Sequence, residues 1–288
     1  MKRYPPLFSA LYRLYEHSGF SLAGAVAFSF LVSLFPFCIF VGALAGIFGG
    51  RDLASTAISQ LFAFLPKAVA EALAPQVEAI MGASRIDLLT LSGFLALFFA
   101  TSAIETMRTA LNSAYRVLET RPYPVCLLIS MIFVFLSAAS MLFLTWIVVF
   151  GPAIASQVAD FEPEWAKSIL DSSWIDTVKR YSMAAFVITS QLVSFHLWLA
   201  AGKRRIADVL PGIVISVLLW IMVAALYSHY LNLSDYKRFY AGLSQLMIAL
   251  IFFQFTAIII ILGAEINRGV MELKKISNDN YLSLKANK

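Results

Sequence analysis

Six long stretches of the chain contain no Asp, Glu, Lys or Arg, and this pattern constrains the fold more than any other feature. They cover residues 18–50, 88–104, 122–159, 181–202, 209–234 and 239–264. A helix needs about 20 apolar residues to cross the hydrocarbon core of a bilayer, and a charge at its centre costs on the order of 3 kcal/mol. The shortest stretch is long enough if Glu105 and Arg108 extend toward water at the interface. The sequence therefore predicts an all-α, polytopic membrane protein with a bundle of six transmembrane helices.

The segments outside the bundle differ in kind. Residues 1–19 are predicted to form a cytoplasmic amphipathic helix whose apolar side faces lipid, with Leu7, Phe8, Leu11, Leu14 and Tyr15. The first outer loop, 49–87, has apolar residues at helical spacing, which predicts short amphipathic helices; a solvated helical hairpin is the alternative. The second outer loop, 152–180, is predicted to be a polar cap, and residues 270–288 a frayed, polar cytoplasmic tail. The membrane domain, 20–269, has predicted spans at about 20–48, 88–110, 123–151, 181–201, 208–230 and 243–267.

The composition excludes several classes of protein. The chain is 60% hydrophobic and 14% charged, whereas soluble domains are nearer one quarter charged. Its net charge of +5 comes from basic residues between and beside the predicted spans, so it does not indicate a nucleic-acid partner. Cys38 and Cys126 fall inside predicted spans and are expected to be buried apolar residues rather than a disulfide. The apolar run before Ala43 is too long for the core of a secretory signal, so the first span is predicted to be retained.

Basic residues predict the orientation in the membrane. One side of the six spans carries 14 Lys and Arg, in short segments next to the helix ends, and the other side carries 8, mostly in long loops. The positive-inside rule then places both termini in the cytoplasm. The expected location is the bacterial inner membrane, with membrane lipids as partners.

Polar side chains within the predicted spans are the best indication of a functional site, because they are expensive there and often functional. Glu105, Asp208 and Glu265 are expected at one level near the cytoplasmic side, which predicts a polar vestibule that opens inward. The alternative is that each carboxylate pairs with a neighbouring arginine and only stabilises a helix end. His196 by itself is expected to make a hydrogen bond between helices rather than to bind a ligand. The candidate vestibule residues are Glu105, Arg108, Asn112, Gln191, His196, Asp208, Gln254, Glu265 and Asn267.

Pro36, after Ser29 and Ser33 in the first predicted span, is expected to kink the helix and free a backbone carbonyl. Ser33 and Pro36 are therefore a candidate hinge.

Several segments resemble one known family. They are Ala25-Val-Ala-Phe-Ser-Phe-Leu-Val-Ser33-Leu-Phe-Pro36, Ala110-Leu-Asn112, Leu210-Pro-Gly-Ile-Val-Ile-Ser-Val-Leu-Leu-Trp220, Tyr240-Ala-Gly-Leu and Leu262-Gly-Ala-Glu265-Ile-Asn267. In order and spacing, over roughly residues 10–270, they resemble the YihY / virulence factor BrkB family of bacterial inner-membrane proteins. The resemblance implies six spans but no settled activity: some members are linked to serum resistance, some carry an old label as ribonuclease BN, and some are proposed to move lipid-type molecules.

No enzyme activity is expected. His17, His196 and His229 lie far apart in the sequence, so the chain offers no clustered ligands for metal-dependent RNA hydrolysis, and it has no P-loop. No cofactor or metal is expected. The favoured hypothesis is transport or flipping of an amphiphilic, lipid-like substrate. The alternative is a non-transporting membrane scaffold that organises cell-envelope proteins or forms a homo-oligomer.

Overall fold

The computed structural model describes residues 6–34, 86–159, 173–233 and 244–286, together with positions 55–56, 58–59, 62, 70 and 74. This part of the chain is helical and contains no strand, as the sequence predicts. The helices are α1 (Pro6–Glu16), a segment at Gly19–Leu34, α4 (Ile86–Tyr115), α5 (Tyr123–Ala159), α7 (Ser173–Ser194) with the π-helix η1 (Phe195–Leu199), α8 (Ile206–Leu233) and α10 (Ser244–Ala286). Most of the predicted first outer loop lies outside the described residues, and so does Pro36.

Within the described residues, four helices are long and apolar enough to cross a membrane, in α4, α5, α8 and α10. A fifth is added if the bent pair Ser9–Glu16 and Gly19–Leu34 counts as one span. The predicted span 181–201 corresponds to α7 and η1, whose apolar part is the shorter helix Ala185–Leu199. The described helices also run beyond the predicted spans, since α5 continues to Ala159 and α7 begins at Ser173.

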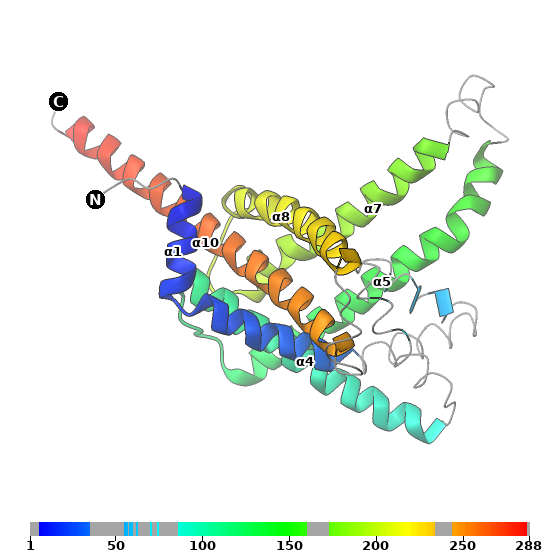
Figure 1. Ribbon diagram of the computed structural model, residues 1–288. Helices are drawn as coiled ribbons and strands as arrows, with labels where there is room; N and C mark the ends of the chain where they lie inside the picture. Colours follow the sequence, from blue (N-terminus) through cyan, green and yellow to red (C-terminus); the bar gives the residue numbers. More distant parts are fainter. Residues whose placement is uncertain are drawn as a thin grey trace.

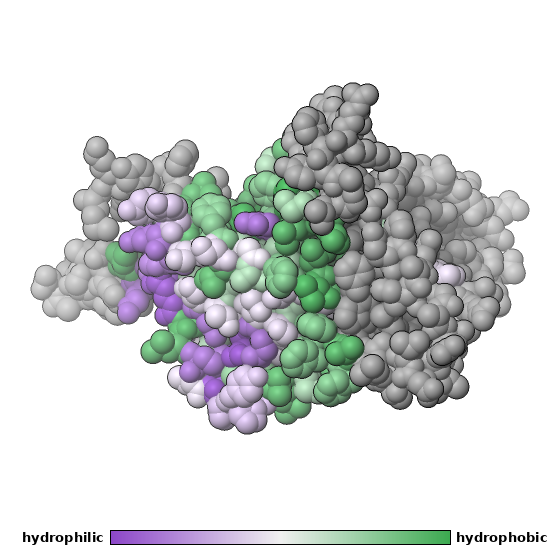
Figure 2. Space-filling model, turned by 60° about the horizontal axis from the view of Figure 1, so that its bottom comes forward, coloured by the Kyte–Doolittle hydropathy of each residue, from purple (hydrophilic) through white to green (hydrophobic). Residues whose placement is uncertain are grey.

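The helices pack around one main core. Figure 1 shows α8 and α10 side by side, with α1 across α10 and the outer parts of α5 and α7 projecting to one side. Leu14, Met107, Leu199, Ile213 and Ile261, which come from five different segments, are all fully buried in this core. We call the end of the bundle at which the loops 116–122 and 200–205 lie the basic end. Figure 2 shows hydrophilic residues gathered at one end of the visible surface, beside a hydrophobic band.

The chain bends sharply between α1 and the next helical segment. Ser18 adopts a left-handed backbone conformation, with φ 57°, and the two helices meet at 73°. This bend turns Leu14 inward, where it is 1% exposed, so the prediction that Leu14 faces lipid is wrong. Leu11 and Tyr15 are exposed, as predicted, at 39% and 74%. The side chains of Leu7 and Phe8 lie outside the described part of the structure.

The crossing of α8 and α10 is the tightest contact in the core. A Cβ atom at Gly212 would overlap the carbonyl oxygen of Gly263, and a Cβ at Gly263 would overlap the hydroxyl of Ser216. The Ser216 hydroxyl donates to the carbonyl of Ile259 at 3.0 Å. Small residues with hydrogen bonds across the contact are typical of helix association in membranes.

Residues beyond 270 do not form the frayed tail that the composition suggests. They continue α10 as helix to Ala286. The pair of Arg268 and Glu272, four residues apart and joined at 2.6 Å, supports this continuation. No proline or glycine follows Gly269 to stop the helix.

Candidate functional site

Ion pairs and hydrogen bonds at the basic end form three separate groups rather than one space shared by Glu105, Asp208 and Glu265. We call them the loop cluster (Glu105, Arg108, Asn112, Glu119, Arg121 and Ser130), the tyrosine hub (Tyr115, His196, Arg204 and Asn267) and the elbow cluster (Arg13, Arg116, Glu265, Arg268 and Glu272). Asp208 belongs to none of them. It pairs at 2.9 Å with Lys274, at the exposed edge of the bundle.

The loop cluster is centred on Glu119, in the turn between α4 and α5. Its carboxylate accepts from Arg108 at 2.8 Å, from Asn112 at 3.0 Å and from the Arg121 Nε at 2.7 Å. The hydrogen bonds from Arg121 are the main reason that the pKa of Glu119 lies far below its usual value, and the same contact raises the pKa of Arg121. Glu119 therefore remains ionised down to strongly acidic pH and holds this turn together.

Glu105 lies on α4 one turn before Arg108, farther into the bundle than Glu119. One of its carboxylate oxygens accepts from Arg108 and the other from the hydroxyl of Ser130 on α5. Arg108 is 7% exposed and Ser130 is fully buried. The Glu105 side chain itself is 18% exposed, and pairing with hydrogen bonds is the form in which a partly buried charge is tolerated.

The tyrosine hub joins α4, η1, α8 and α10. The Tyr115 hydroxyl lies 2.8 Å from His196 Nδ1 and accepts from the amide of Asn267 at 3.2 Å, while the Asn267 Oδ1 accepts from the backbone N–H of Gly212 at 2.6 Å. His196 and Asn267 are fully buried. His196 thus makes a hydrogen bond between helices, as the sequence analysis expected. Its Nε2 atom has no hydrogen-bond partner among the described residues.

Arg204 closes the hub from the loop side. Its guanidinium lies 3.7 Å from the centre of the Tyr115 ring and donates to the carbonyls of His196 and Ala201. Burial lowers the pKa of Arg204 from its usual value. Because the π-helix η1 ends at Leu199, its carbonyls need donors, and Arg204 supplies one to the carbonyl of His196.

Further hydrogen bonds fix the loop 200–205 to the end of α4. The Asn112 Oδ1 accepts from the backbone N–H of Ala201 at 2.7 Å. Arg121 donates to the carbonyls of Trp198 and Leu199, the latter at 2.9 Å. The α4–α5 turn and the loop after η1 are therefore held as one unit.

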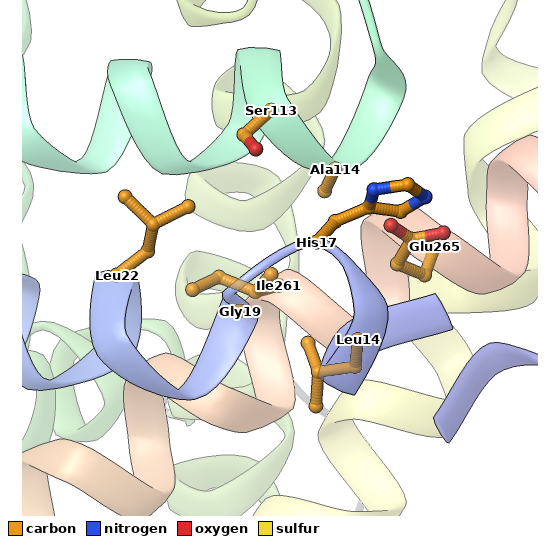
Figure 3. Close-up of a pocket in the computed structure, with 8 residues that line it drawn as sticks. All are labelled: Leu14, His17, Gly19, Leu22, Ser113, Ala114, Ile261 and Glu265. Atoms are coloured by element: carbon orange, nitrogen blue, oxygen red, sulfur yellow. The ribbon is translucent and has the colours of Figure 1, made fainter. Parts of the chain in front are cut away.

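The elbow cluster lies where α1, the end of α4 and α10 meet. Arg116 Nη2 is 3.6 Å from Glu265 Oε2, and Glu272 accepts from Arg13 at 3.3 Å and from Arg268 at 2.6 Å. Glu265 is 1% exposed, and its Oε2 accepts no hydrogen bond within the described part. Beside it is a small crevice (Figure 3), lined by Leu14, His17, Leu22, Ser113 and Ile261 together with Glu265.

A larger pocket lies deeper in the bundle, with a volume of about 230 Å³. We call it the mid-bundle pocket. Most of its lining is apolar, and it includes Phe30, Ser33, Ile104, Val134, Ser137 and Phe253. Gln191, one of the predicted residues, donates to the lining residue Ser137 at 3.0 Å.

Two other predicted residues have different surroundings. Gln254 is half-buried on α10 opposite Gly24. Ser33 donates to the carbonyl of Phe30 in its own helix, while its partner in the candidate hinge, Pro36, lies outside the described residues.

Sequence analysis missed the two residues on which the clusters depend most. Glu119 is the single acidic residue between Arg116 and Arg121, and this spacing is a signal for a local ion pair. The basic residues of this loop were used only to predict the orientation in the membrane. Tyr115 is absent from the predicted site, because nothing in the sequence distinguishes it from other residues at helix ends. No three of the described His, Cys, Asp and Glu residues lie together as metal ligands would.

Long apolar helices with buried polar clusters at one end define a helical membrane protein. The chain belongs to the virulence factor BrkB family, whose profile matches residues 10–286. It is 27% identical over 266 residues to a Bacillus subtilis (strain 168) protein that carries the name ribonuclease-like protein YfkH, and the alignment covers 92% of this chain and 94% of that protein. No solved structure matches the chain. The resemblance that the sequence motifs indicate is therefore confirmed.

Proposed function

We propose that the protein moves an amphiphilic, lipid-like substrate across the bacterial inner membrane. The observation that carries the proposal is the mid-bundle pocket, which has an apolar lining and a volume of about 230 Å³. This is several times the roughly 30 Å³ that a water molecule occupies in the liquid. The pocket has room for a segment of hydrocarbon chain.

A charged group lies next to this pocket. Ile104 and Val134 line it, and Glu105 follows Ile104 directly, while Ser130 is one turn from Val134 on α5. Glu105 and Ser130 are hydrogen-bonded to each other across α4 and α5. An apolar space beside a paired carboxylate suits a molecule that has both a chain and a polar head.

The proposal includes six spans, with both termini and the basic end in the cytoplasm. Support comes from the Lys and Arg bias of the sequence and from the position of Arg116, Arg121 and Arg204 in short loops at one end of the helices. In this arrangement the loop cluster and the tyrosine hub close the cytoplasmic end beneath the pocket.

We further propose that the protein is not a ribonuclease and uses no nucleic-acid partner, metal or cofactor. Glu105, Glu119 and Glu265 each form an ion pair with an arginine, which leaves their carboxylates poorly placed as metal ligands. A direct test is incubation of the purified protein with RNA and divalent cations, in which cleavage lost on substitution of any of these carboxylates would refute the proposal.

The test of transport uses protein reconstituted into vesicles that contain a fluorescent phospholipid, with a membrane-impermeant quencher added outside. The Ala103→Phe variant fills the mid-bundle pocket, because Ala103 lines it and is 2% exposed. The matched control is Ala139→Phe, at an exposed position of α5. Lipid movement is expected to stop in the first variant and to continue in the second.

Two further variants make the test robust. Phe253→Ala enlarges the pocket without overpacking and is expected to retain or increase movement. Glu105→Gln is expected to slow lipid movement, and so is Glu265→Gln. Equal movement in wild type, Ala103→Phe and Glu105→Gln would refute the proposal. If the folded wild type moves no lipid and retains envelope proteins on purification, the scaffold function would replace transport.

A further inference from the structure

The elbow cluster contains more positive than negative charge. Arg13, Arg116 and Arg268 come from three different segments of the chain, and among the described residues their ion-pair partners are Glu265 and Glu272. The cluster therefore has one arginine more than it has carboxylates, at the meeting point of α1, α4 and α10.

Several donors and acceptors of the cluster are incompletely used. The Nη1 atom of Arg268 is buried and has no hydrogen-bond partner among the described residues. Arg116 reaches Glu265 at 3.6 Å, which is an ion pair but too long for a hydrogen bond. Buried polar groups in folded proteins normally have partners, so the unpaired Nη1 of Arg268 indicates a missing acceptor.

Arg116 occupies a backbone position that an arginine rarely adopts. Its φ is 53°, in the left-handed region, and the bonds Arg116 N–H to Ser113 and Val117 N–H to Asn112 form the motif that usually ends a helix with glycine. A side chain at this position costs free energy compared with glycine. The cost is consistent with a use for the guanidinium that glycine could not provide.

We expect the cluster to lie at the level of a membrane surface. The exposed side of α1 carries Leu11, Tyr12 and Tyr15, while Arg13 turns toward Gly269 and Glu272 on α10. An amphipathic helix with exposed tyrosines at a sharp bend is typical of the interface between headgroups and hydrocarbon.

An apolar crevice runs beside the charged groups. Figure 3 shows Leu14, Leu22 and Ile261 on its walls, with His17 and Glu265 on the same side of it. Glu265 pairs with Arg116 from the buried side, and the side chains of Arg13 and Arg116 are 26% and 30% exposed. Guanidinium groups match the oxygens of phosphate by paired hydrogen bonds.

We propose that the elbow between α1 and α10 binds a phosphate group, with Arg116 and Arg268 as its main donors, and that the phosphate belongs to the headgroup of an anionic membrane lipid. The site is separate from the mid-bundle pocket and does not depend on transport. The Glu265 carboxylate acts by positioning Arg116.

The experiment measures lipid retained by the full-length protein in native mass spectrometry, after detergent purification and addition of phosphatidylglycerol or phosphatidylcholine. Wild type is expected to retain phosphatidylglycerol preferentially. The double variant Arg116→Gln and Arg268→Gln is expected to lose on the order of tenfold in phosphatidylglycerol affinity or more, since charge-assisted hydrogen bonds are lost. The matched control is Arg205→Gln, an exposed arginine at the same end of the bundle, which is expected to change nothing.

Three comparisons keep the test decisive. Arg116→Lys should recover part of the affinity, because it keeps the charge and loses the paired geometry. If the double variant does not fold, Arg13→Gln on the more exposed α1 replaces it. This variant should weaken phosphatidylglycerol binding, but by less than the tenfold expected of the double variant. Competition by excess inorganic phosphate supports free phosphate as a ligand, and its failure supports a lipid headgroup. Undiminished phosphatidylglycerol binding by the arginine variants, or an equal loss in Arg205→Gln, would overturn the proposal.

Discussion

The contact of Gly212 with Gly263 gives the sharpest prediction of stability. In Gly212→Ala, the added methyl group would overlap the Gly263 carbonyl oxygen and the Asn267 side chain. Neither can move easily, because the oxygen belongs to the backbone of α10 and Asn267 accepts from the Gly212 N–H at 2.6 Å. The two helices must separate locally for the alanine to fit.

The magnitude of the change in stability follows from two destabilising effects and one stabilising effect. Overpacking a tight contact costs about 1–3 kcal/mol, and weakening the Gly212 hydrogen bond costs about 1 kcal/mol. Alanine recovers about 1 kcal/mol through its higher helix propensity. The net expectation is a destabilisation of about 1–3 kcal/mol, and 2 kcal/mol corresponds to a fall of roughly 5 °C in Tm for a protein of this size.

The assay is thermal unfolding of detergent-purified protein, followed by fluorescence-detected size-exclusion chromatography. Gly93→Ala is the matched control, because Gly93 is also helical and a Cβ there would meet no atom within 4 Å. That variant should be unchanged or slightly more stable. If Gly212→Ala unfolds at the temperature of Gly93→Ala, the close approach of α8 and α10 is not a determinant of stability and the reasoning fails.

Three further predictions concern the polar groups at the basic end. Tyr115→Phe removes the buried hydroxyl that faces His196 and should lower stability by about 1–3 kcal/mol in the same thermal assay; an unchanged Tm would contradict this. The pKa of Glu119 is lowered mainly by Arg121, so this carboxylate contributes stability that is fully present above its usual pKa of 4.5 and is lost as the pH falls through the lower folded-state pKa. Wild type should therefore lose stability on acidification below pH 4.5 more steeply than Glu119→Gln, and parallel pH profiles would count against the prediction. Asp208→Asn should cost less than about 1 kcal/mol, since its partner on α10 is largely exposed, and a larger loss of Tm would show that this pair matters more than its position indicates.

The apolar spans could be predicted from the sequence because the penalty for a charge in hydrocarbon acts on each residue separately. This is why α4, α5, α8 and α10 were found close to their predicted positions. The ends of the helices were less predictable. The continuation of α10 to Ala286 was not predicted, because the polar composition of residues 270–288 suggested a frayed tail. The absence of a proline or glycine after Gly269 is visible in the sequence and favours the longer helix.

The sequence identifies polar residues within or near the spans, but it does not show which of them become partners. Asn267 was recognised as a polar residue near the end of a span, yet its contacts with Gly212 and Tyr115 depend on how α8 and α4 cross α10. Helical periodicity gives the face of one helix and not its register against another. For the same reason, the inward position of Leu14 could not be foreseen, since it results from the bend at Ser18.

The length of α10 has a mechanical consequence. At about 1.5 Å per residue, a continuous helix from Ser244 to Ala286 is roughly 65 Å long, about twice the thickness of the hydrocarbon core. A helix without a break moves as one rigid rod. The closest contact of α10 with α8, at Gly263, lies near the middle of the helix. A molecule that displaces the projecting end of α10 sideways would tilt the other half of the helix about this contact. A signal received outside the bilayer would then reach the interior of the bundle through the helix itself.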